Sequence, residues 1–204
     1  MSDEKNTPAP TPHTSPFTPI DQHLFESRTI FVSGEVDSDL AQKVNRQLMA
    51  MERANPTAPI VLWIDCPGGE VYSGFSIYDT IRFIQPKVIT VASGIVASMG
   101  SVIALSAEKE NRLSLPNAKF LIHQPLIGGV LRGQASDIDI HARDIIALKK
   151  KMHQLYAERT GGSVEKFVEL MERDRWVEPT EAIELGLISK IIDKRKSLDA
   201  LVKA

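Results

Sequence analysis

The fold of this chain is decided by the segment Val88-Ile89-Thr90-Val91-Ala92-Ser93-Gly94-Ile95-Val96-Ala97-Ser98-Met99-Gly100. Residues 88–92 form an apolar run with the length of a buried strand. Gly94 then opens a turn, and the apolar residues 98–107 predict a helix. A buried strand that passes through a glycine-containing turn into a helix is typical of α/β folds with parallel strands.

Strand and helix signals alternate on both sides of this segment. Further strands are predicted over 29–32, 60–64, 112–115 and 119–123. Helices are predicted over 71–84 and over a segment that Asp37 or Ser38 can cap. The turns Ser33-Gly34 and Pro67-Gly68-Gly69 separate the first two strands from these helices. This order predicts one layered α/β domain whose strands pair in parallel.

A long helix is predicted after the glycine-rich segment 128–133. Asp137 can cap it, apolar residues follow at helical spacing for about five turns, and Gly161-Gly162 ends it. A domain of this size does not need so long a helix to cover its own core, so we expect the helix to project and to contact another subunit. Ser163 is predicted to cap a shorter helix, and Pro179 to begin the last one.

The two ends of the chain differ in composition from the rest. Residues 1–20 contain five prolines with several serines and threonines. Such a segment buries too little apolar surface to offset the entropy of ordering it. We expect 1–20 to be a flexible arm, 21–194 to be the folded domain and 195–204 to be a C-terminal tail.

The composition excludes several classes of protein. With 43% hydrophobic and 25% charged residues and a net charge of −2, no electrostatic feature indicates binding to nucleic acid or to a membrane surface. No apolar run reaches the roughly 18 residues of a membrane span, and the first residues do not resemble a secretory signal. The single cysteine, Cys66, can form neither an internal disulfide nor a cysteine-based zinc site. We therefore expect a cytoplasmic protein.

Ser98 lies where a predicted strand ends and a helix begins. Backbone N–H groups at such a position are unpaired and can stabilise an anion beside the serine. A serine nucleophile needs such donors, because its tetrahedral intermediate carries an oxyanion. On its own, a serine at this position is more often a helix cap. Pro67-Gly68-Gly69 also separates a strand from a helix, and the two turns can face each other at the carboxyl edge of the sheet.

His123 closes the predicted strand 119–123 and is the best placed of the five histidines to act as a base for Ser98. Taken alone, a histidine at the end of an apolar strand is more often part of the core. The other four are expected in or beside the arm (His13, His23) or facing solvent or a partner subunit (His141, His153). The histidines lack the spacing of metal ligands, so no metal site is expected.

A third catalytic group cannot be chosen from the spacing of residues along the chain. A serine–histidine pair is commonly oriented by a carboxylate. The candidates are Asp65, Asp137, Asp139, Asp144, Asp174 and Asp193.

Several blocks of this sequence resemble the proteolytic subunit of the Clp protease family. They cover roughly residues 26–193 in the family's order, which makes the resemblance specific although any one block would be weak. The blocks are Pro67-Gly68-Gly69, Ser76-Ile77-Tyr78-Asp79-Thr80, Ala97-Ser98-Met99-Gly100, Ile122-His123-Gln124-Pro125-Leu126, Gly133-Gln134-Ala135-Ser136-Asp137-Ile138, Ile140-His141-Ala142-Arg143, Glu172-Arg173-Asp174-Arg175-Trp176 and Glu181-Ala182-Ile183-Glu184-Leu185-Gly186-Leu187.

The resemblance implies a crotonase-like α/β spiral of βα units with a projecting handle at about 126–160. It also implies a serine endopeptidase that needs no cofactor. The catalytic residues that it implies are Ser98 as nucleophile, His123 as general base, Asp174 as the carboxylate that orients His123, and the backbone N–H groups of Gly69 and Met99 as the oxyanion hole.

The partners that the resemblance implies are other subunits, an ATPase and unfolded proteins. Two stacked seven-subunit rings, formed by this chain alone or with a paralogous subunit, would make a tetradecamer around a chamber. A Clp-type AAA+ unfoldase driven by ATP would feed unfolded proteins into it. Leu126 and Gly128 would lie beside the peptide substrate, and Trp63 and Phe83 would belong to the surface where the unfoldase docks.

The sequence departs from the family pattern at its start, where the proline-rich arm replaces the usual axial loop and an aromatic, basic stretch. Cys66 also stands where serine is more usual. Two other functions share part of the pattern. A crotonase-type acyl-CoA enzyme has the fold but does not need Ser98 and His123, and a non-catalytic ring subunit would lack part of the triad. The intact Ser98, His123 and Asp174 favour the peptidase.

Overall fold

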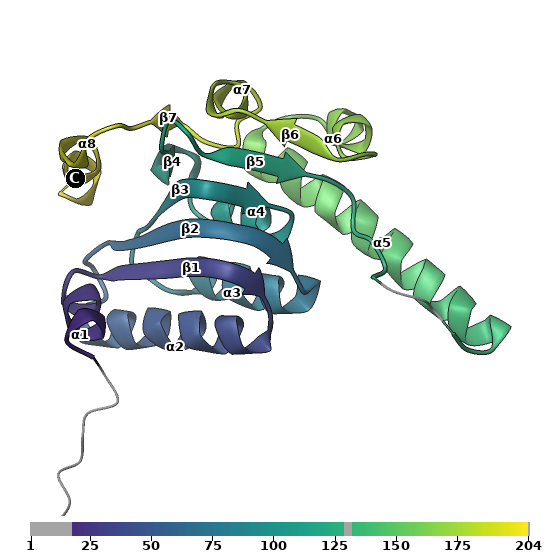
Figure 1. The fold of residues 1–204 in the computed structure, drawn as a ribbon, viewed down its shortest axis with the longest axis horizontal. Coiled ribbons are helices and arrows are strands. Elements are labelled where there is room, and N and C mark those ends of the chain that lie inside the picture. The colour runs from purple at the N-terminus through teal and green to yellow at the C-terminus, as the bar shows by residue number, and fades with distance from the viewer. Residues whose placement is uncertain (1–17, 129–131, 204) are drawn as a thin grey trace, which may run out of the picture.

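The computed structural model describes residues 18–128 and 132–203, and in this part of the chain seven strands form one sheet (Figure 1). The sheet order is β1-β2-β3-β4-β7, and β5 pairs with both β3 and β6. The strands are β1 (Thr29–Val36), β2 (Ile60–Gly69), β3 (Val88–Ala97), β4 (Arg112–Ser114), β5 (Lys119–Ile122), β6 (Arg175–Val177) and β7 (Lys190–Ile191). Every pair is parallel except β5 with β6, so the predicted parallel sheet is confirmed, with one antiparallel pair at its edge.

The strand β3 has two partners on the same side. Its first half pairs with β4 from Thr90 to Ala92, and its second half pairs with β5 from Ile95 to Ala97. The second half leads directly to Ser98. The pairing of β3 with β5 therefore decides what lies next to this serine.

Helices cover the sheet and follow most of its strands. They are α1 (Pro19–Glu26), α2 (Ser38–Ala54), α3 (Val71–Phe83), α4 (Met99–Ala104), α5 (Ala135–Thr160), α6 (Val164–Leu170), α7 (Pro179–Glu184) and α8 (Arg195–Val202), with a 3₁₀ turn at Lys109–Asn111. As predicted, Asp37 caps α2, and its side chain accepts a hydrogen bond from the N–H of Leu40. Ser163 caps α6 in the same way.

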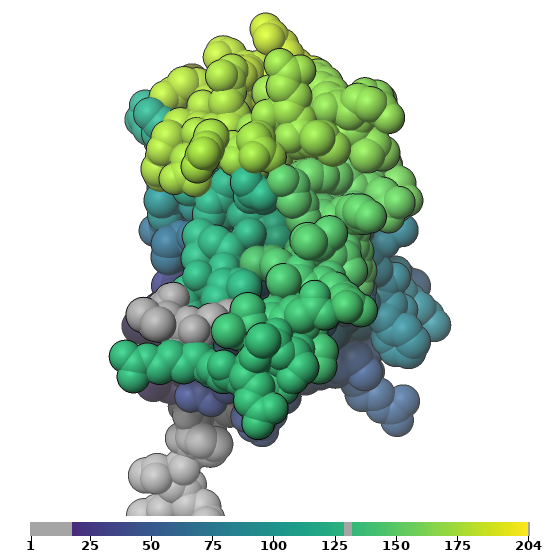
Figure 2. Space-filling view, turned by 90° about the vertical axis from the view of Figure 1, so that its right-hand side faces the viewer, coloured from purple at the N-terminus to yellow at the C-terminus, as the bar shows by residue number. Residues whose placement is uncertain are grey.

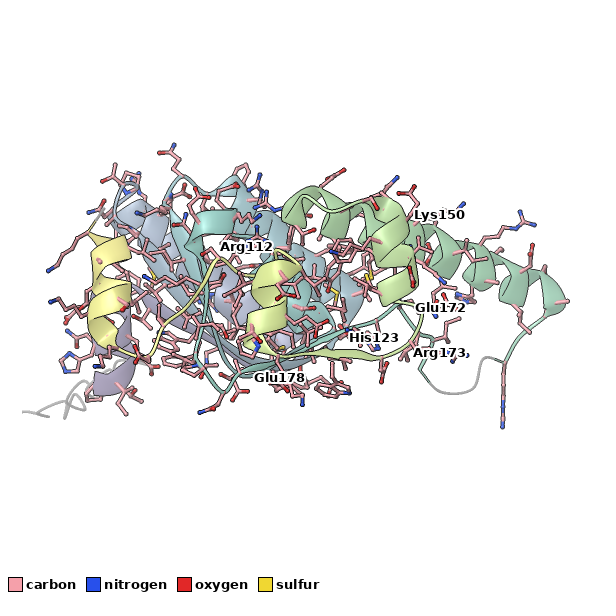
Figure 3. The ribbon with its side chains drawn as sticks, turned by 90° about the horizontal axis from the view of Figure 1, so that it is seen from above. Arg112, His123, Lys150, Glu172, Arg173 and Glu178 are labelled. Atoms are coloured by element: carbon pink, nitrogen blue, oxygen red, sulfur yellow. The ribbon has the colours of Figure 1, made fainter. Side chains whose placement is uncertain are left out.

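The helix α5 projects from the body of the domain, as predicted (Figures 1 and 3). Figure 2 looks onto the side from which it leaves. The buried residues of α5 lie near its C-terminal end: Met152, His153, Leu155, Tyr156, Ala157 and Thr160. Gly161 ends the helix, as predicted, and adopts the left-handed conformation. The helix begins at Ala135, so Asp137 lies in its first turn and is not its cap. No helix among the described residues is both long and apolar enough to cross a membrane.

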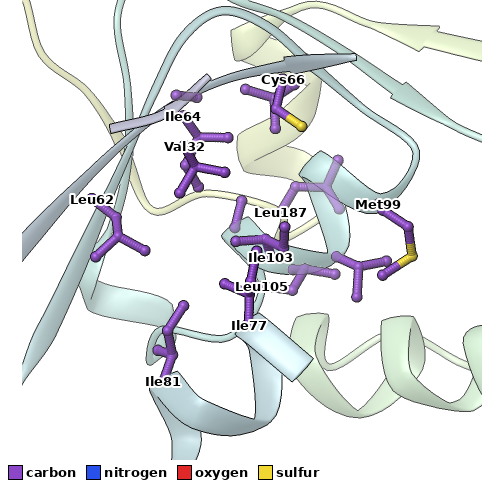
Figure 4. Packing of buried hydrophobic residues seen from close by; sticks show 14 of the residues in the cluster. Val32, Leu62, Ile64, Cys66, Ile77, Ile81, Met99, Ile103, Leu105 and Leu187 are labelled. Carbon is purple, nitrogen blue, oxygen red and sulfur yellow. The ribbon is translucent and has the colours of Figure 1, made fainter. Parts of the chain in front are cut away.

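The main core packs the sheet against α3 and α4 (Figure 4). Its strand residues include Val32, Leu62, Ile64 and Cys66, and its helix residues include Ile77, Ile81, Met99 and Ile103. A buried aliphatic side chain of this kind contributes roughly 1.5–3 kcal/mol. This layer fixes the end of β2 and the start of α4, which lie on the two sides of the candidate site.

Three predicted turns are bulges within longer strands. β1 continues through Ser33-Gly34 with a shift of register, and β2 continues through Pro67-Gly68-Gly69 to pair with Val36. β3 continues past Gly94 to Ala97, again with a shift of register against β2. The glycines supply the positive φ angles that these bulges need, and the neighbouring strand supplies hydrogen-bond partners beyond each bulge. The sequence prediction ended these strands too early.

The structure also differs from the prediction at both ends. α1 begins at Pro19, inside the expected arm, because Thr18 and Asp21 form a capping box; residues 1–17 lie outside the described part of the chain. The expected tail contains α8, so the helix at Pro179 is not the last. Leu198 of α8 is buried in a second cluster with Val61, Ile89, Val91, Leu113 and Ile192.

His153 was expected to face solvent or a partner, and the structure contradicts this. Its side chain is buried, with only 3% of its surface exposed, because it lies at the base of α5 where the helix packs on the domain. Its Nε2 atom has no hydrogen-bond partner among the described residues. His141, on the projecting part of the same helix, is exposed as expected.

Burial, together with the ammonium of Lys149, lowers the pKa of His153 below its ordinary value. The unfolded chain then binds the proton more readily than the folded protein. Stability from this group is fully present above about pH 6.5 and is lost as the pH falls below it toward the folded-state pKa. We expect the melting temperature of the protein to fall more steeply between pH 7 and pH 5 than that of His153→Asn. The exposed His141→Asn is the control and should keep the steep slope; equal slopes for all three proteins would contradict the prediction.

Candidate active site

Ser98 stands at a strained turn between β3 and α4. Its φ and ψ angles are 52° and −120°, a conformation that residues other than glycine rarely adopt and that costs of the order of 1–3 kcal/mol. Its N–H donates to the carbonyl oxygen of Leu121 at 2.9 Å. Among the described residues its side chain makes no capping hydrogen bond to α4. The structure therefore does not support the helix-cap interpretation. A sharp strand-to-helix turn of this kind presents the serine oxygen for attack.

The pairing of β3 with β5 places Ser98 and His123 at the same edge of the sheet. Ala97 and Leu121 are partners in this parallel pair. Ser98 follows one residue later on its strand, and His123 follows two residues later on the other. Because parallel strands end at the same edge, both residues belong to the carboxyl edge of the sheet.

His123 is paired with Asp174, which is one of the six aspartates that spacing along the chain left open and the one that the family resemblance implies. The antiparallel pairing of Ile122 with Arg175 brings the two residues opposite each other. The Nδ1 atom of His123 lies 3.0 Å from Oδ1 of Asp174. Since a carboxylate only accepts, Nδ1–H donates, and Nε2 is left free to accept a proton. The His123 side chain is 16% exposed, so it is neither a sealed core residue nor freely solvated.

The segment that carries Asp174 is tied to β5 and to α5. The backbone N–H of Gln124 donates to the carbonyl oxygen of Met171 at 2.8 Å. The side-chain amide of Gln124 donates to the backbone carbonyl oxygen of Glu172 at 2.7 Å. The ammonium of Lys149 donates to the Glu172 carboxylate at 2.8 Å and lowers its pKa. These contacts hold Asp174 against His123 and connect both residues to the handle helix.

A cavity of about 480 Å³ opens beside this pair. It is lined by His123, Gln124, Leu126, Glu172, Arg173 and Asp174. Figure 3 shows His123, Glu172 and Arg173 grouped near the point where α5 leaves the domain. Leu126 is 68% exposed. Gly128 is exposed and lies at the end of the described segment. A second hollow, between α1 and α2, lies away from Ser98.

Gly68, which the sequence prediction did not single out, lies directly against Ser98. A Cβ added to Gly68 would come within 2.6 Å of the Ser98 Cβ and 3.2 Å of the Met99 nitrogen. At Gly69, whose backbone N–H the resemblance assigns to the oxyanion hole, an added Cβ would instead point toward β1 and meet the Val36 backbone. The pair of adjacent glycines in the sequence indicated that the backbone comes close to another group here, but it did not indicate which of the two glycines contacts Ser98.

We expect Gly68→Ala to lower the rate of peptide hydrolysis by about 100-fold, since a displacement of about 1 Å at the reacting group has effects of this size. The added methyl group must displace Ser98 or Met99. In addition, the backbone φ of Gly68 is +101°, a conformation that is strained for any residue with a side chain. The measurement is kcat on a short fluorogenic peptide. Gly34→Ala, also at positive φ but with no atom near the added methyl group, is the control for backbone strain. Equal losses in the two variants would show that the contact with Ser98 is unimportant.

The two residues predicted to dock an unfoldase lie away from this edge. Trp63 on β2 is half-buried and stacks on Phe31, with ring centroids 6.4 Å apart. Phe83, at the end of α3, is 78% exposed. Neither residue lines the cavity beside His123 and Asp174.

Comparison with known proteins shows the family of the chain. A family model described as "Clp protease" matches residues 14–195. The chain belongs to the Clp protease family. The chain is 43% identical over 177 residues to the ATP-dependent Clp protease proteolytic subunit 2 of Treponema pallidum (strain Nichols). The match covers 87% of this chain and 88% of the relative. Identity and coverage are the same for the ATP-dependent Clp protease proteolytic subunit 2 of Treponema denticola. A solved structure of a ClpP1 mutant from Listeria monocytogenes superposes with a TM-score of 0.80 at 40% identity, covering 88% of this chain and 99% of that one.

Membership of the Clp family confirms the predicted crotonase-like α/β fold. The chain is a serine peptidase and the proteolytic subunit of an ATP-dependent Clp protease. The alternative of a crotonase-type acyl-CoA enzyme is thereby set aside.

Proposed function

We propose that Ser98 is the nucleophile of this Clp peptidase, that His123 is its general base and that Asp174 orients His123. The observation that carries the proposal is the 3.0 Å contact between Nδ1 of His123 and Asp174, at the sheet edge where the strained Ser98 also stands. Asp174 fixes the tautomer of His123 in which Nε2 can accept a proton.

The reaction follows from these roles. Nε2 of His123 takes the proton of the Ser98 hydroxyl as its oxygen attacks the peptide carbonyl carbon. The N–H groups of Gly69 and Met99 stabilise the oxyanion of the tetrahedral intermediate. The intermediate expels the amine, which receives the proton from His123. Water, activated by His123, then hydrolyses the acyl ester on Ser98 and frees the enzyme. Leu126 and Gly128 lie alongside the peptide, and no cofactor is required.

The assembly that we propose is a pair of stacked seven-subunit rings joined through the handle. Its support is the projecting part of α5, which leaves Ile138, Ile140 and Ile146 exposed by 42%, 63% and 54%. Apolar residues so exposed on a lone subunit mark an interface. Sedimentation of the purified chain distinguishes rings formed by this chain alone from rings that need a paralogous subunit. The cytoplasmic location expected from the sequence stays a prediction.

We also propose that an AAA+ unfoldase delivers unfolded proteins to this chamber, since the relatives are named as subunits of an ATP-dependent protease. The exposed Phe83 and the half-exposed pair of Phe31 and Trp63 are the apolar surface that supports a docking role for Trp63 and Phe83.

Labelling of the assembled protein with a fluorophosphonate tests the catalytic roles. The reagent is expected to react with one serine, and peptide mapping should identify it as Ser98. His123→Ala should slow the labelling by several powers of ten. Labelling at another serine would overturn the assignment, and a properly assembled protein that does not react at all would be the non-catalytic ring subunit.

A further inference from the structure

A buried chain of hydrogen bonds joins the base of α5 to the backbone of Ser98. The phenol oxygen of Tyr156 lies 2.6 Å from Oγ of Ser101, and Oγ of Ser101 lies 2.7 Å from the carbonyl oxygen of Ser98. Tyr156 has no exposed surface, and Ser101 is 2% exposed. The contacts are therefore shielded from water.

The direction of these bonds follows from what each group can donate. Oγ of Ser101 lies 2.7 Å from the carbonyl oxygen of Ser98 and 3.5 Å from that of Leu121. Both carbonyls only accept, so the single hydroxyl hydrogen of Ser101 points toward them and principally at the nearer one, Ser98. The hydrogen between Ser101 and Tyr156 must then come from the tyrosine. Burial raises the pKa of Tyr156, so the phenol keeps its proton. The order of donation runs from Tyr156 to Ser101 to Ser98.

The end of this chain is a backbone group under strain. The carbonyl of Ser98 also accepts from the N–H groups of Ser101 at 3.0 Å and Val102 at 3.3 Å. A residue at the φ of Ser98 keeps that conformation only where its surroundings over-determine it. A hydroxyl that is itself an acceptor makes a stronger donor, so Tyr156 reinforces the bond that Ser101 makes to Ser98.

Tyr156 is itself held firmly at the base of the handle. Its ring packs on Phe167 of α6, with centroids 5.4 Å apart. Its carbonyl accepts from the Thr160 hydroxyl at 2.7 Å. The phenol of Tyr156 is therefore held in place by α5 and α6, and it contacts Ser101 in the helix that follows Ser98.

We propose that Tyr156 and Ser101 are positioning residues that set the backbone of Ser98 for attack, and that through them the base of the handle controls the reactivity of the nucleophile. This inference rests on the proposed role of Ser98. Neither residue contacts the substrate cavity beside His123, so both act through Ser98.

The test measures the reactivity of Ser98 in the full-length, assembled protein. Tyr156→Phe removes only the phenol oxygen, and Ser101→Ala removes the hydroxyl that it reaches. Each is expected to lower the second-order rate of fluorophosphonate labelling, and kcat on a short peptide, by about tenfold while KM stays unchanged, because the substrate contacts are untouched. The double variant should be no slower than Ser101→Ala, since the two groups form one chain.

Ser106→Ala is the matched control. The Ser106 hydroxyl is buried just beyond α4 and donates to the carbonyl of Ile103 at 2.6 Å, but it is not connected to Tyr156. It should label at the wild-type rate. An equal slowing in Ser106→Ala, or a change in KM alone, would overturn the inference in favour of a general packing effect.

The outcomes separate this inference from the function on which it rests. If Ser98→Ala is inactive and Tyr156→Phe labels at the wild-type rate, the positioning role is wrong and the nucleophile stands. If Ser98→Ala remains active, the proposed function itself has failed. Should Tyr156→Phe not assemble, Ser101→Ala carries the same test, because it breaks the chain without altering α5.

Discussion

The Ser98→Ala protein is expected to fold and assemble normally and to hydrolyse peptides roughly 10⁶-fold more slowly than the wild type. The substitution removes the atom that forms the covalent intermediate, so neither His123 nor the backbone donors can compensate. Alanine, like serine, is not branched at Cβ, so it can adopt the φ of 52° that Ser98 has, and the melting temperature should change little. The measurement combines hydrolysis of a short fluorogenic peptide with melting and sedimentation.

Ser93→Ala is the control for this experiment. Ser93 lies five residues earlier, next to the bulge of β3, and is half-buried like Ser98. Its loss should leave hydrolysis within about twofold of the wild type, since surface substitutions away from the reacting groups change little. Substantial hydrolysis by a well-assembled Ser98→Ala protein would remove Ser98 from the mechanism.

The part of the site that could be predicted from the sequence depends on local signals. An apolar run, a glycine and a helical pattern around 88–107 are enough to place Ser98 at the end of a strand, and a second apolar run places His123 at the end of another. Parallel strands share their carboxyl edge, and from the sequence this rule predicted only that the two glycine-containing turns face each other. The pairing of β3 with β5, which puts Ser98 and His123 at one edge, is visible only in the structure.

The bulges could not be predicted, because a glycine with positive φ serves a turn and a bulge equally well. A bulge differs from a turn in that the neighbouring strand still pairs with the residues that follow the glycine, as Val36 of β1 pairs with Gly69 of β2. That is a property of two segments more than thirty residues apart. The error mattered, because the bulged end of β2 is what brings Gly68 onto Ser98.

The residues at the base of α5 were missed for a related reason. Helical spacing identifies an apolar stripe, and it says nothing about where along a long helix the domain begins to cover it. His153 is polar and Tyr156 carries a polar hydroxyl, so the helical pattern does not predict whether their side chains are buried or exposed. Both are buried at this end of the helix, where Tyr156 packs against Phe167 of α6 and bonds to Ser101 of α4.

Spacing along the chain left six aspartates open, and the antiparallel pairing of β5 with β6 brings Asp174 to His123 across 51 residues of sequence. Asp174→Asn is expected to lower kcat by roughly 10⁴-fold at neutral pH. The amide can present an N–H to Nδ1 of His123, which then accepts, so that Nε2 carries the hydrogen and can no longer take the proton of Ser98. The measurement is kcat on a short peptide, with KM expected to stay within a few-fold. Asp193→Asn, at an exposed aspartate from the same six, is the control and should be fully active. If Asp174→Asn kept more than a tenth of the wild-type kcat, the tautomer of His123 would not depend on this carboxylate. The 3.0 Å contact would then be only one of the bonds that fasten β6 to the end of β5.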